Sequence, residues 1–111
     1  MKIKSIAVLI VLSIPFVVAA AAENTGAGNI VLKGGRLGSV AFPHRKHQDT
    51  LFDCKLCHNL FPKAAGSIER LKNKGSLKRK ATMYQCVDCH KNKADKREKS
   101  GPRSCKGCHK K

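Results

Sequence analysis

The pattern of hydrophobic and polar positions divides the chain into two unequal parts. An apolar run from Ile6 to Val18 follows the positively charged start Met1-Lys2-Ile3-Lys4, and the small residues Ala19 to Ala22 come next. A charged start, an apolar run and an Ala-x-Ala cleavage site are typical of a secretory signal peptide. The pattern therefore predicts a cleaved signal at residues 1–22 and a single exported domain at residues 23–111.

An uncleaved membrane anchor is the alternative interpretation of the same stretch. The segment from Ile3 to Ala22 is just long enough to span a bilayer as a helix. Pro15 and the alanine-rich end favour cleavage instead, since such an end matches a signal cleavage site. We therefore expect no stable membrane insertion after cleavage.

Beyond this run, large apolar side chains are few and scattered. A domain this short buries only a modest fraction of its surface. The few large apolar residues therefore cannot build a sufficient core. Disulfides, metals or a bulky apolar cofactor must then stabilise the fold. The large apolar residues are Ile30, Val31, Leu32, Leu37, Val40, Phe42, Leu51, Phe52, Leu56, Leu60, Phe61, Ile68, Leu71, Leu77 and Val87.

The charge of the chain is strongly positive. Without Lys2 and Lys4, 21 of the 23 basic residues remain against 7 acidic ones, which gives a formal charge of +14 for residues 23–111. Such a balance predicts acidic partners. Nucleic acid is disfavoured, because the chain is predicted to be exported and offers only one Tyr and four Phe for stacking on bases.

All six cysteines occur in three copies of one five-residue motif, Cys-x-x-Cys-His. This motif is the signature of covalent haem attachment. Two thiols on one helical turn reach the two vinyl groups of a haem, and the following imidazole is placed under the iron as the proximal ligand. The copies are Cys54-Lys55-Leu56-Cys57-His58, Cys86-Val87-Asp88-Cys89-His90 and Cys105-Lys106-Gly107-Cys108-His109.

Zinc binding and disulfide formation are the two alternatives for these cysteines. Zinc ribbons use two thiol pairs and need no histidine after them. A disulfide across so short a spacing is strained and staples little of the chain. Neither explains the histidine that follows each pair, so the sequence predicts three haem c groups, which would form the core under short helices and loops.

The two remaining histidines, His44 and His47, are candidate distal ligands. They follow Pro43, which suits the first position of a short helix, and they lie about one turn apart. At that spacing they can address two different haems. The alternative is a pair of surface histidines, but no other histidine is available for three irons.

The sequence closely resembles the triheme cytochromes c of the cytochrome c7 family, class III multihaem proteins related to the tetraheme cytochromes c3. The resemblance rests on the segments Asn29–Lys33 and Val40–Gln48 and on the three motifs. It implies a small, mostly irregular and α-helical multihaem fold with a short N-terminal two-stranded β-sheet, in which Ile30–Leu32 pairs with Val40–Phe42.

The resemblance also implies ligands and a role. His44 is expected opposite His58 on the haem of the first motif, and His47 opposite His90 on that of the second. Family members are periplasmic electron carriers in metal or sulfur respiration. The expected partners are acidic redox proteins, such as other multihaem cytochromes or membrane-bound reductases and dehydrogenases, and the chain is expected to be monomeric and not an enzyme.

The sequence departs from the family pattern at two places. The connection between His58 and Cys86 is longer than usual, and its basic stretch, residues 68–80, is expected to form a helical turn or two on a solvated surface. The family also has a third distal histidine shortly before the second motif, and residues 80–85 contain none.

Met83 lies where that histidine is missing and is the only methionine after residue 1. A thioether is a good ligand for haem iron, so Met83 is predicted to bind opposite His109. The alternatives are that Met83 only fills space in the core, which leaves the last iron open, or that Tyr84 or a lysine binds it. With an open iron, the function would shift from electron carrier to haem-based sensor or small-ligand binder.

Overall fold

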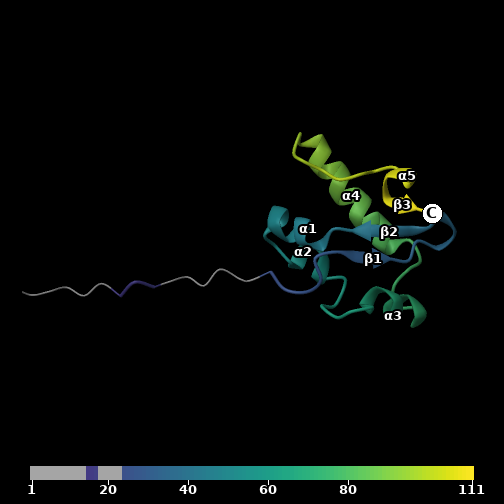
Figure 1. Ribbon diagram of the computed structural model, residues 1–111, viewed down its shortest axis with the longest axis horizontal. Coiled ribbons are helices and arrows are strands. Elements are labelled where there is room, and N and C mark those ends of the chain that lie inside the picture. The colour runs from purple at the N-terminus through teal and green to yellow at the C-terminus, as the bar shows by residue number, and fades with distance from the viewer. Residues whose placement is uncertain (1–14, 18–23) are drawn as a thin grey trace, which may run out of the picture.

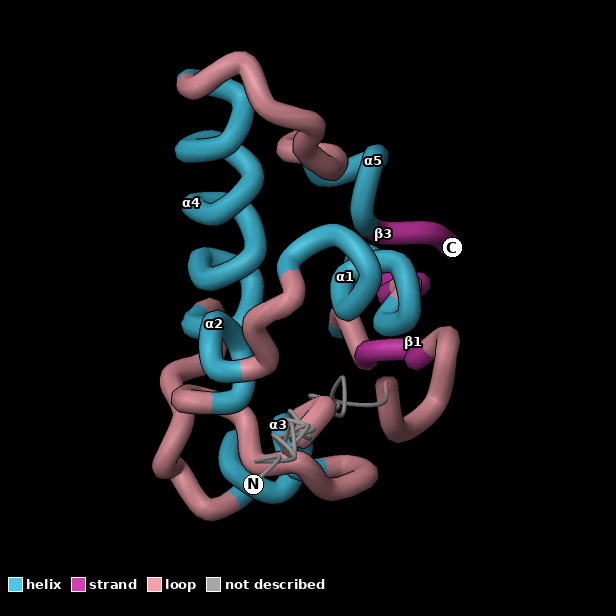
Figure 2. The backbone as a smooth tube through the Cα atoms, turned by 90° about the vertical axis from the view of Figure 1, so that its left-hand side faces the viewer, coloured by secondary structure: helices cyan, strands magenta, loops and turns pink. Residues whose placement is uncertain are grey.

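The computed structural model describes residues 15–17 and 24–111. The predicted signal peptide, residues 1–22, therefore lies outside the described residues except for 15–17. Of the helices that are described, none has the length and apolar character needed to cross a membrane. Figure 1 shows a small sheet with helices around it, and Figure 2 shows α4 (Ala81–Asp95) running along one side of the domain.

A three-stranded antiparallel sheet forms the centre of the fold, in the order β1-β2-β3. The predicted pair is confirmed: in β1 (Ile30–Leu32) and β2 (Ser39–Phe42), Ile30 lies opposite Phe42 and Leu32 opposite Val40. The third strand, β3 (His109–Lys110), was not predicted. Its two residues are too few to show an alternating pattern, and it begins at the histidine of the last motif.

Glycine makes the approach of β3 to β2 possible. Gly38 has a φ of +95°, and a Cβ at this position would lie 2.1 Å from the carbonyl oxygen of Lys110. Only a residue without a side chain fits there. The chain end is thereby joined to β2, with His109 opposite Val40 in the register.

The helix that carries the two candidate distal histidines, α1, spans His44–Leu51. It begins one residue later than predicted, since Pro43 precedes it with a ψ of 81°. The Pro43 carbonyl still accepts a hydrogen bond from the backbone N–H of His47, at 3.2 Å. The helix ends at Phe52, which adopts the left-handed conformation.

Each cysteine motif lies on or beside a helix. The short helices α2 (Lys55–His58) and α5 (Cys105–Cys108) were expected, but α4 has 15 residues and carries the second motif in its middle. No glycine or proline interrupts the stretch from Ala81 to Asp95, so nothing stops the helix after the haem motif.

The described part of the chain has almost no apolar core. Only two large apolar side chains are buried there, Phe61 with 8% and Leu77 with 6% of its surface exposed. The expectation that residues 68–80 are solvated is therefore wrong for Leu77. The helix α3 (Ser67–Asn73) forms as expected, and its residue Leu71 offers its carbonyl to the N–H groups of Ser76 and Leu77, which turns Leu77 inward.

Candidate haem-binding sites

The three motifs present their cysteines on tight helical turns. In the first motif, the backbone N–H of His58 donates to the carbonyl of Cys54 at 2.9 Å, which closes one turn around the two thiols. In the third, Ser104 caps α5 by accepting a hydrogen bond at its Oγ from the N–H of Gly107, at 3.2 Å. All six thiols are unpaired. Each pair thus lies on one turn, as attachment to two vinyl groups requires.

Half-buried thiols from different motifs lie near one another. Burial, together with smaller contributions from the nearby Cys57, Cys108 and Cys89, raises the pKa of the Cys86 thiol to about 11. Burial also raises the pKa of Cys57, with smaller contributions from Cys89 and Cys54. The surroundings of these two thiols are therefore partly shielded from water, which suits a site for an apolar porphyrin.

The structure contains two pairs of histidines, and within each pair the two imidazole rings face each other. The ring centres of His44 and His58 lie 6.1 Å apart, with ring planes 84° apart. Those of His47 and His90 lie 6.2 Å apart, with planes only 28° apart. The two candidate distal histidines on α1 therefore point at two different motifs. The resemblance implied the same two pairs as ligands of the first and second haems, and that role stays a prediction.

The Nδ1 atom of every histidine in the chain lies against a backbone carbonyl. A carbonyl oxygen only accepts, so Nδ1 carries the proton and the unprotonated Nε2 is free to bind a metal. Such a hydrogen bond fixes the tautomer of a metal-binding histidine and orients its ring. The acceptors are Ala27 for His44 (2.9 Å), Pro43 for His47 (2.9 Å), Phe61 for His58 (2.8 Å), Pro102 for His90 (2.7 Å) and Gly38 for His109 (3.1 Å).

The spacing of the facing rings fits a six-coordinate haem iron. A metal–imidazole bond is about 2 Å long, and the ring centre lies a little farther from the metal than the bonded nitrogen. Two imidazoles on opposite sides of an iron therefore have ring centres about 6 Å apart. Both observed separations match this value. The ring spacing and the free Nε2 atoms together meet the requirements of two bis-histidine haems.

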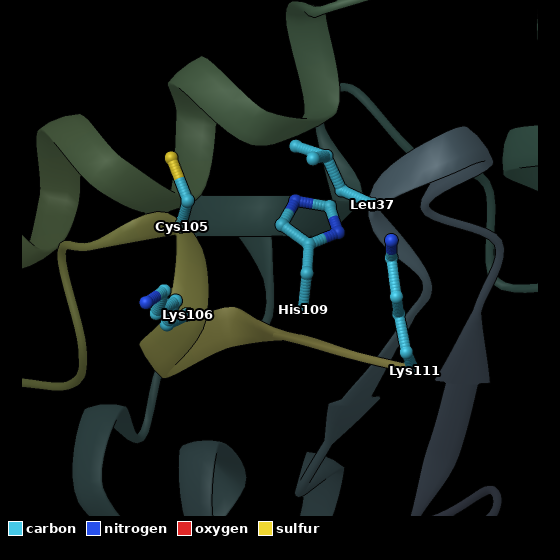
Figure 3. A pocket seen from close by; sticks show the side chains of 5 residues that line it. All are labelled: Leu37, Cys105, Lys106, His109 and Lys111. Atoms are coloured by element: carbon cyan, nitrogen blue, oxygen red, sulfur yellow. The ribbon is translucent and has the colours of Figure 1, made fainter.

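The third motif has no facing histidine. His109 and Cys105 extend from the α5–β3 segment towards the same side, where Leu37 lies across from them (Figure 3). Next to this site is a groove of about 890 Å³, which is lined by Cys108, His109 and Met83 among others. Met83 is 38% exposed, whereas Tyr84 does not line the groove. The groove thus brings Met83 and His109 to one cavity.

Basic side chains surround the same groove. Its lining has a single acidic residue, Glu69, whose carboxylate lies 3.6 Å from the ammonium group of Lys72. A bound group that carries carboxylates, as a haem does, is electrostatically favoured there. The basic residues of the lining are Lys33, Arg36, Lys72, Arg79 and Lys80.

Several residues that hold the histidines were missed in the sequence. The Phe42 ring lies 4.4 Å from the His47 ring and 6.0 Å from that of His44, centre to centre, so it packs against both. Gly34 and Gly101 pack against His109 and His90, because a Cβ at either would come within 2.4 Å of a ring atom. Phe42 next to Pro43-His44 was a usable signal, but an isolated glycine gives none.

Comparison with known proteins agrees with this geometry. A sequence profile described as "Cytochrome c7 and related cytochrome c" matches residues 40–110. PpcC, a cytochrome c7 from Geobacter sulfurreducens, is 33% identical over 77% of this chain and 99% of its own, with a TM-score of 0.53. The triheme cytochrome PpcA of the same organism is 36% identical over 77% of this chain and 100% of its own, also with a TM-score of 0.53.

A third structure, from the triheme cytochrome family of that organism, is 35% identical over the same share of this chain and 100% of its own, with a TM-score of 0.51. No curated protein matches the chain. The profile match and these identities, together with the three motifs and the histidine pairs, lead to one conclusion. The chain belongs to the cytochrome c7 family, multihaem electron-transfer proteins with covalently bound c-type haems.

Proposed function

We propose that the protein is a periplasmic electron carrier with three haems, two of them bis-histidine and one ligated by histidine and methionine. The observation that carries this proposal is the two pairs of facing imidazoles, with ring centres 6.1 and 6.2 Å apart, whose Nδ1 atoms are held by carbonyls. The first haem site comprises Cys54, Cys57, His58 and His44; the second comprises Cys86, Cys89, His90 and His47; the third comprises Cys105, Cys108, His109 and Met83.

The bound haems supply iron centres that take up and release single electrons. His44 with His58, and His47 with His90, would hold the first and second irons between two imidazoles, which would leave no coordination position there for a substrate. Because backbone carbonyls already orient these imidazole rings, little reorganisation would be needed during electron transfer. The residues thus support electron transfer and provide no site for catalysis at the first and second haems.

The proposed location rests on the N-terminal sequence. Residues 1–22 have the order of a secretory signal, and an exported chain of residues 23–111 would work in the periplasm. Of the proposed respiratory partners, those with acidic surfaces fit a chain with a formal charge of +14 after cleavage, or +16 before it. Metal or sulfur respiration and a monomeric state are part of the same proposal.

Replacement of His47 tests the bis-histidine assignment. In His47→Ala the second iron loses its distal ligand, so a high-spin ferric signal should appear in the electron paramagnetic resonance spectrum of the oxidised protein. The wild-type protein should show two distinct low-spin bis-histidine species, because the ring planes are 84° apart at the first site and 28° apart at the second. Only the near-parallel species should disappear in the variant.

The neighbouring Lys46→Ala provides the matched control, since Lys46 is exposed on the same helix. It should leave all signals unchanged. A His47→Ala protein that keeps both low-spin species would contradict the assignment of His47 as a ligand.

Replacement of Met83 tests the ligand of the third haem. The oxidised wild-type protein should show a sulfur-to-iron charge-transfer band at the red end of the visible range, and Met83→His should abolish it. The variant should also lower the reduction potential of this haem, because methionine ligation raises the potential relative to a second histidine. Optical spectra and a redox titration measure the two effects.

The matched control is Tyr84→Phe, which changes the adjacent residue and should leave the band intact. A wild-type protein that shows a high-spin ferric signal and lacks this band would contradict the assignment of Met83 as a ligand. An open iron would then favour the alternative function, a haem-based sensor or binder of small ligands.

Salt dependence tests the proposed acidic partners. Lys55, Lys91, Lys106 and Lys110 are exposed beside the haem motifs, so they should steer an acidic redox protein towards the haems. Stopped-flow rates of electron transfer to such a protein should fall by about tenfold or more between low and physiological ionic strength. A small uncharged oxidant is the control and should react at a nearly constant rate. An equally flat response with the acidic protein would refute the steering role.

A further inference from the structure

The segment between α4 and α5 contacts the second haem motif through Gly101 and Pro102. The Pro102 carbonyl accepts the hydrogen bond from Nδ1 of His90, at 2.7 Å. A Cβ at Gly101 would lie 2.4, 2.7 and 2.9 Å from Cε1, Nε2 and Nδ1 of the same ring. The backbone of these two residues thus lies directly against the His90 imidazole, and no side chain fits between them.

Pro102 also abuts the third haem motif. A Cβ at Gly107, inside α5, would lie 2.8 Å from the Cβ of Pro102 and 3.0 Å from the Oγ of Ser104. The Sγ of Cys108 is 3.8 Å from the Pro102 carbonyl oxygen. Since a proline Cβ cannot rotate away, a displacement of α5 at Gly107 must move the backbone of Pro102.

The beginning of this segment is fixed as well. Glu98 accepts a hydrogen bond at its carboxylate from the Lys93 ammonium group, at 2.7 Å, and its backbone N–H donates to the Lys93 carbonyl at 2.9 Å. Only Lys99 and Ser100 lie between Glu98 and Gly101. Because this connection is so short, Gly101 and Pro102 have little freedom to move independently. A displacement of Pro102 therefore also displaces the His90 ring, which Gly101 contacts.

We propose that Gly101-Pro102 is a positioning wedge that couples the orientation of His90, at the second haem site, to the packing of α5, at the third. This inference rests on the proposed function in that both sites bind a haem. The hydrogen bond from Nδ1 of His90 to the Pro102 carbonyl would tune the basicity of the imidazole, and through it the reduction potential of an iron bound at Nε2. A structural change at the third site would therefore alter the second site through the backbone, in addition to any electrostatic effect.

A substitution inside the third motif provides the test. Gly107→Ala should shift the haem methyl resonances of the second haem in nuclear magnetic resonance spectra of the oxidised holoprotein, because those shifts follow the orientation of the axial imidazole. The matched control is Lys106→Ala, the other variable position of that motif, which is exposed. The control should leave the second haem unchanged. If Gly107→Ala changes only the third haem, or none, the wedge is refuted.

Two further variants make the test independent of how well Gly107→Ala folds. Gly101→Ala adds a methyl group against the His90 ring and so displaces the wedge from the second site. It should shift resonances of the third haem as well as of the second. Pro102→Gly removes the Cβ next to Gly107, so the double variant Pro102→Gly/Gly107→Ala should show a smaller shift of the second haem than Gly107→Ala alone. Where Gly107→Ala yields no holoprotein, Gly101→Ala decides: a shift confined to the second haem overturns the coupling.

The spectrum of the wild-type protein separates this inference from the proposed function. If the second and third motifs bind low-spin haems in the wild-type protein, the proposed function stands even where all wedge variants leave the other site unchanged. If the wild-type protein lacks a haem at either motif, the proposed function itself fails.

Discussion

The hydrogen bond from histidine Nδ1 to a backbone carbonyl is the interaction on which the rest of this fold depends. It occurs at all five histidines, and its acceptors lie in loops, in a strand-flanking turn and before a helix. Much of the irregular backbone can be understood as a set of carbonyls placed to hold imidazoles. Short helices then bring the thiols to the same places, so side-chain geometry rather than regular structure defines the domain.

The small number of buried apolar side chains fits a domain that is organised around its histidines and cysteines. Phe61 and Leu77 are the only large apolar residues buried in the described part of the chain, and Met83, Leu56 and Leu60 remain substantially exposed. Covalently held porphyrins would cover such surfaces and supply the apolar volume that a chain this short cannot supply itself. The Phe42 ring, which packs against both distal histidines, and the groove beside Met83 are then parts of cofactor surroundings rather than defects in packing.

The features that could be predicted from the sequence are those marked by a pattern within a short stretch of residues. The Cys-x-x-Cys-His spacing, the pair His44 and His47 and the two strands that flank Gly34 to Gly38 all lie within short stretches. The pairing of the two strands is confirmed, and the ligand roles of the histidines and cysteines stay predictions. The third strand and the contact of Gly34 with His109 depend on segments distant in the chain. The inward turn of Leu77 and the contact of Gly101 with His90 involve nearer residues, but no repeating sequence pattern marks them. An isolated glycine or a two-residue strand gives no periodic signal, so only the folded structure identifies their roles.

Intact-mass spectrometry of the purified, denatured protein tests the central claim most directly, because thioether-linked haems stay attached when the fold is lost. We expect the mass of the chain from Glu23 to Lys111 plus three haems, one for each motif. A mass with two haems or fewer, or with none, would contradict an architecture in which all three cysteine pairs and all five histidines exist to hold haem.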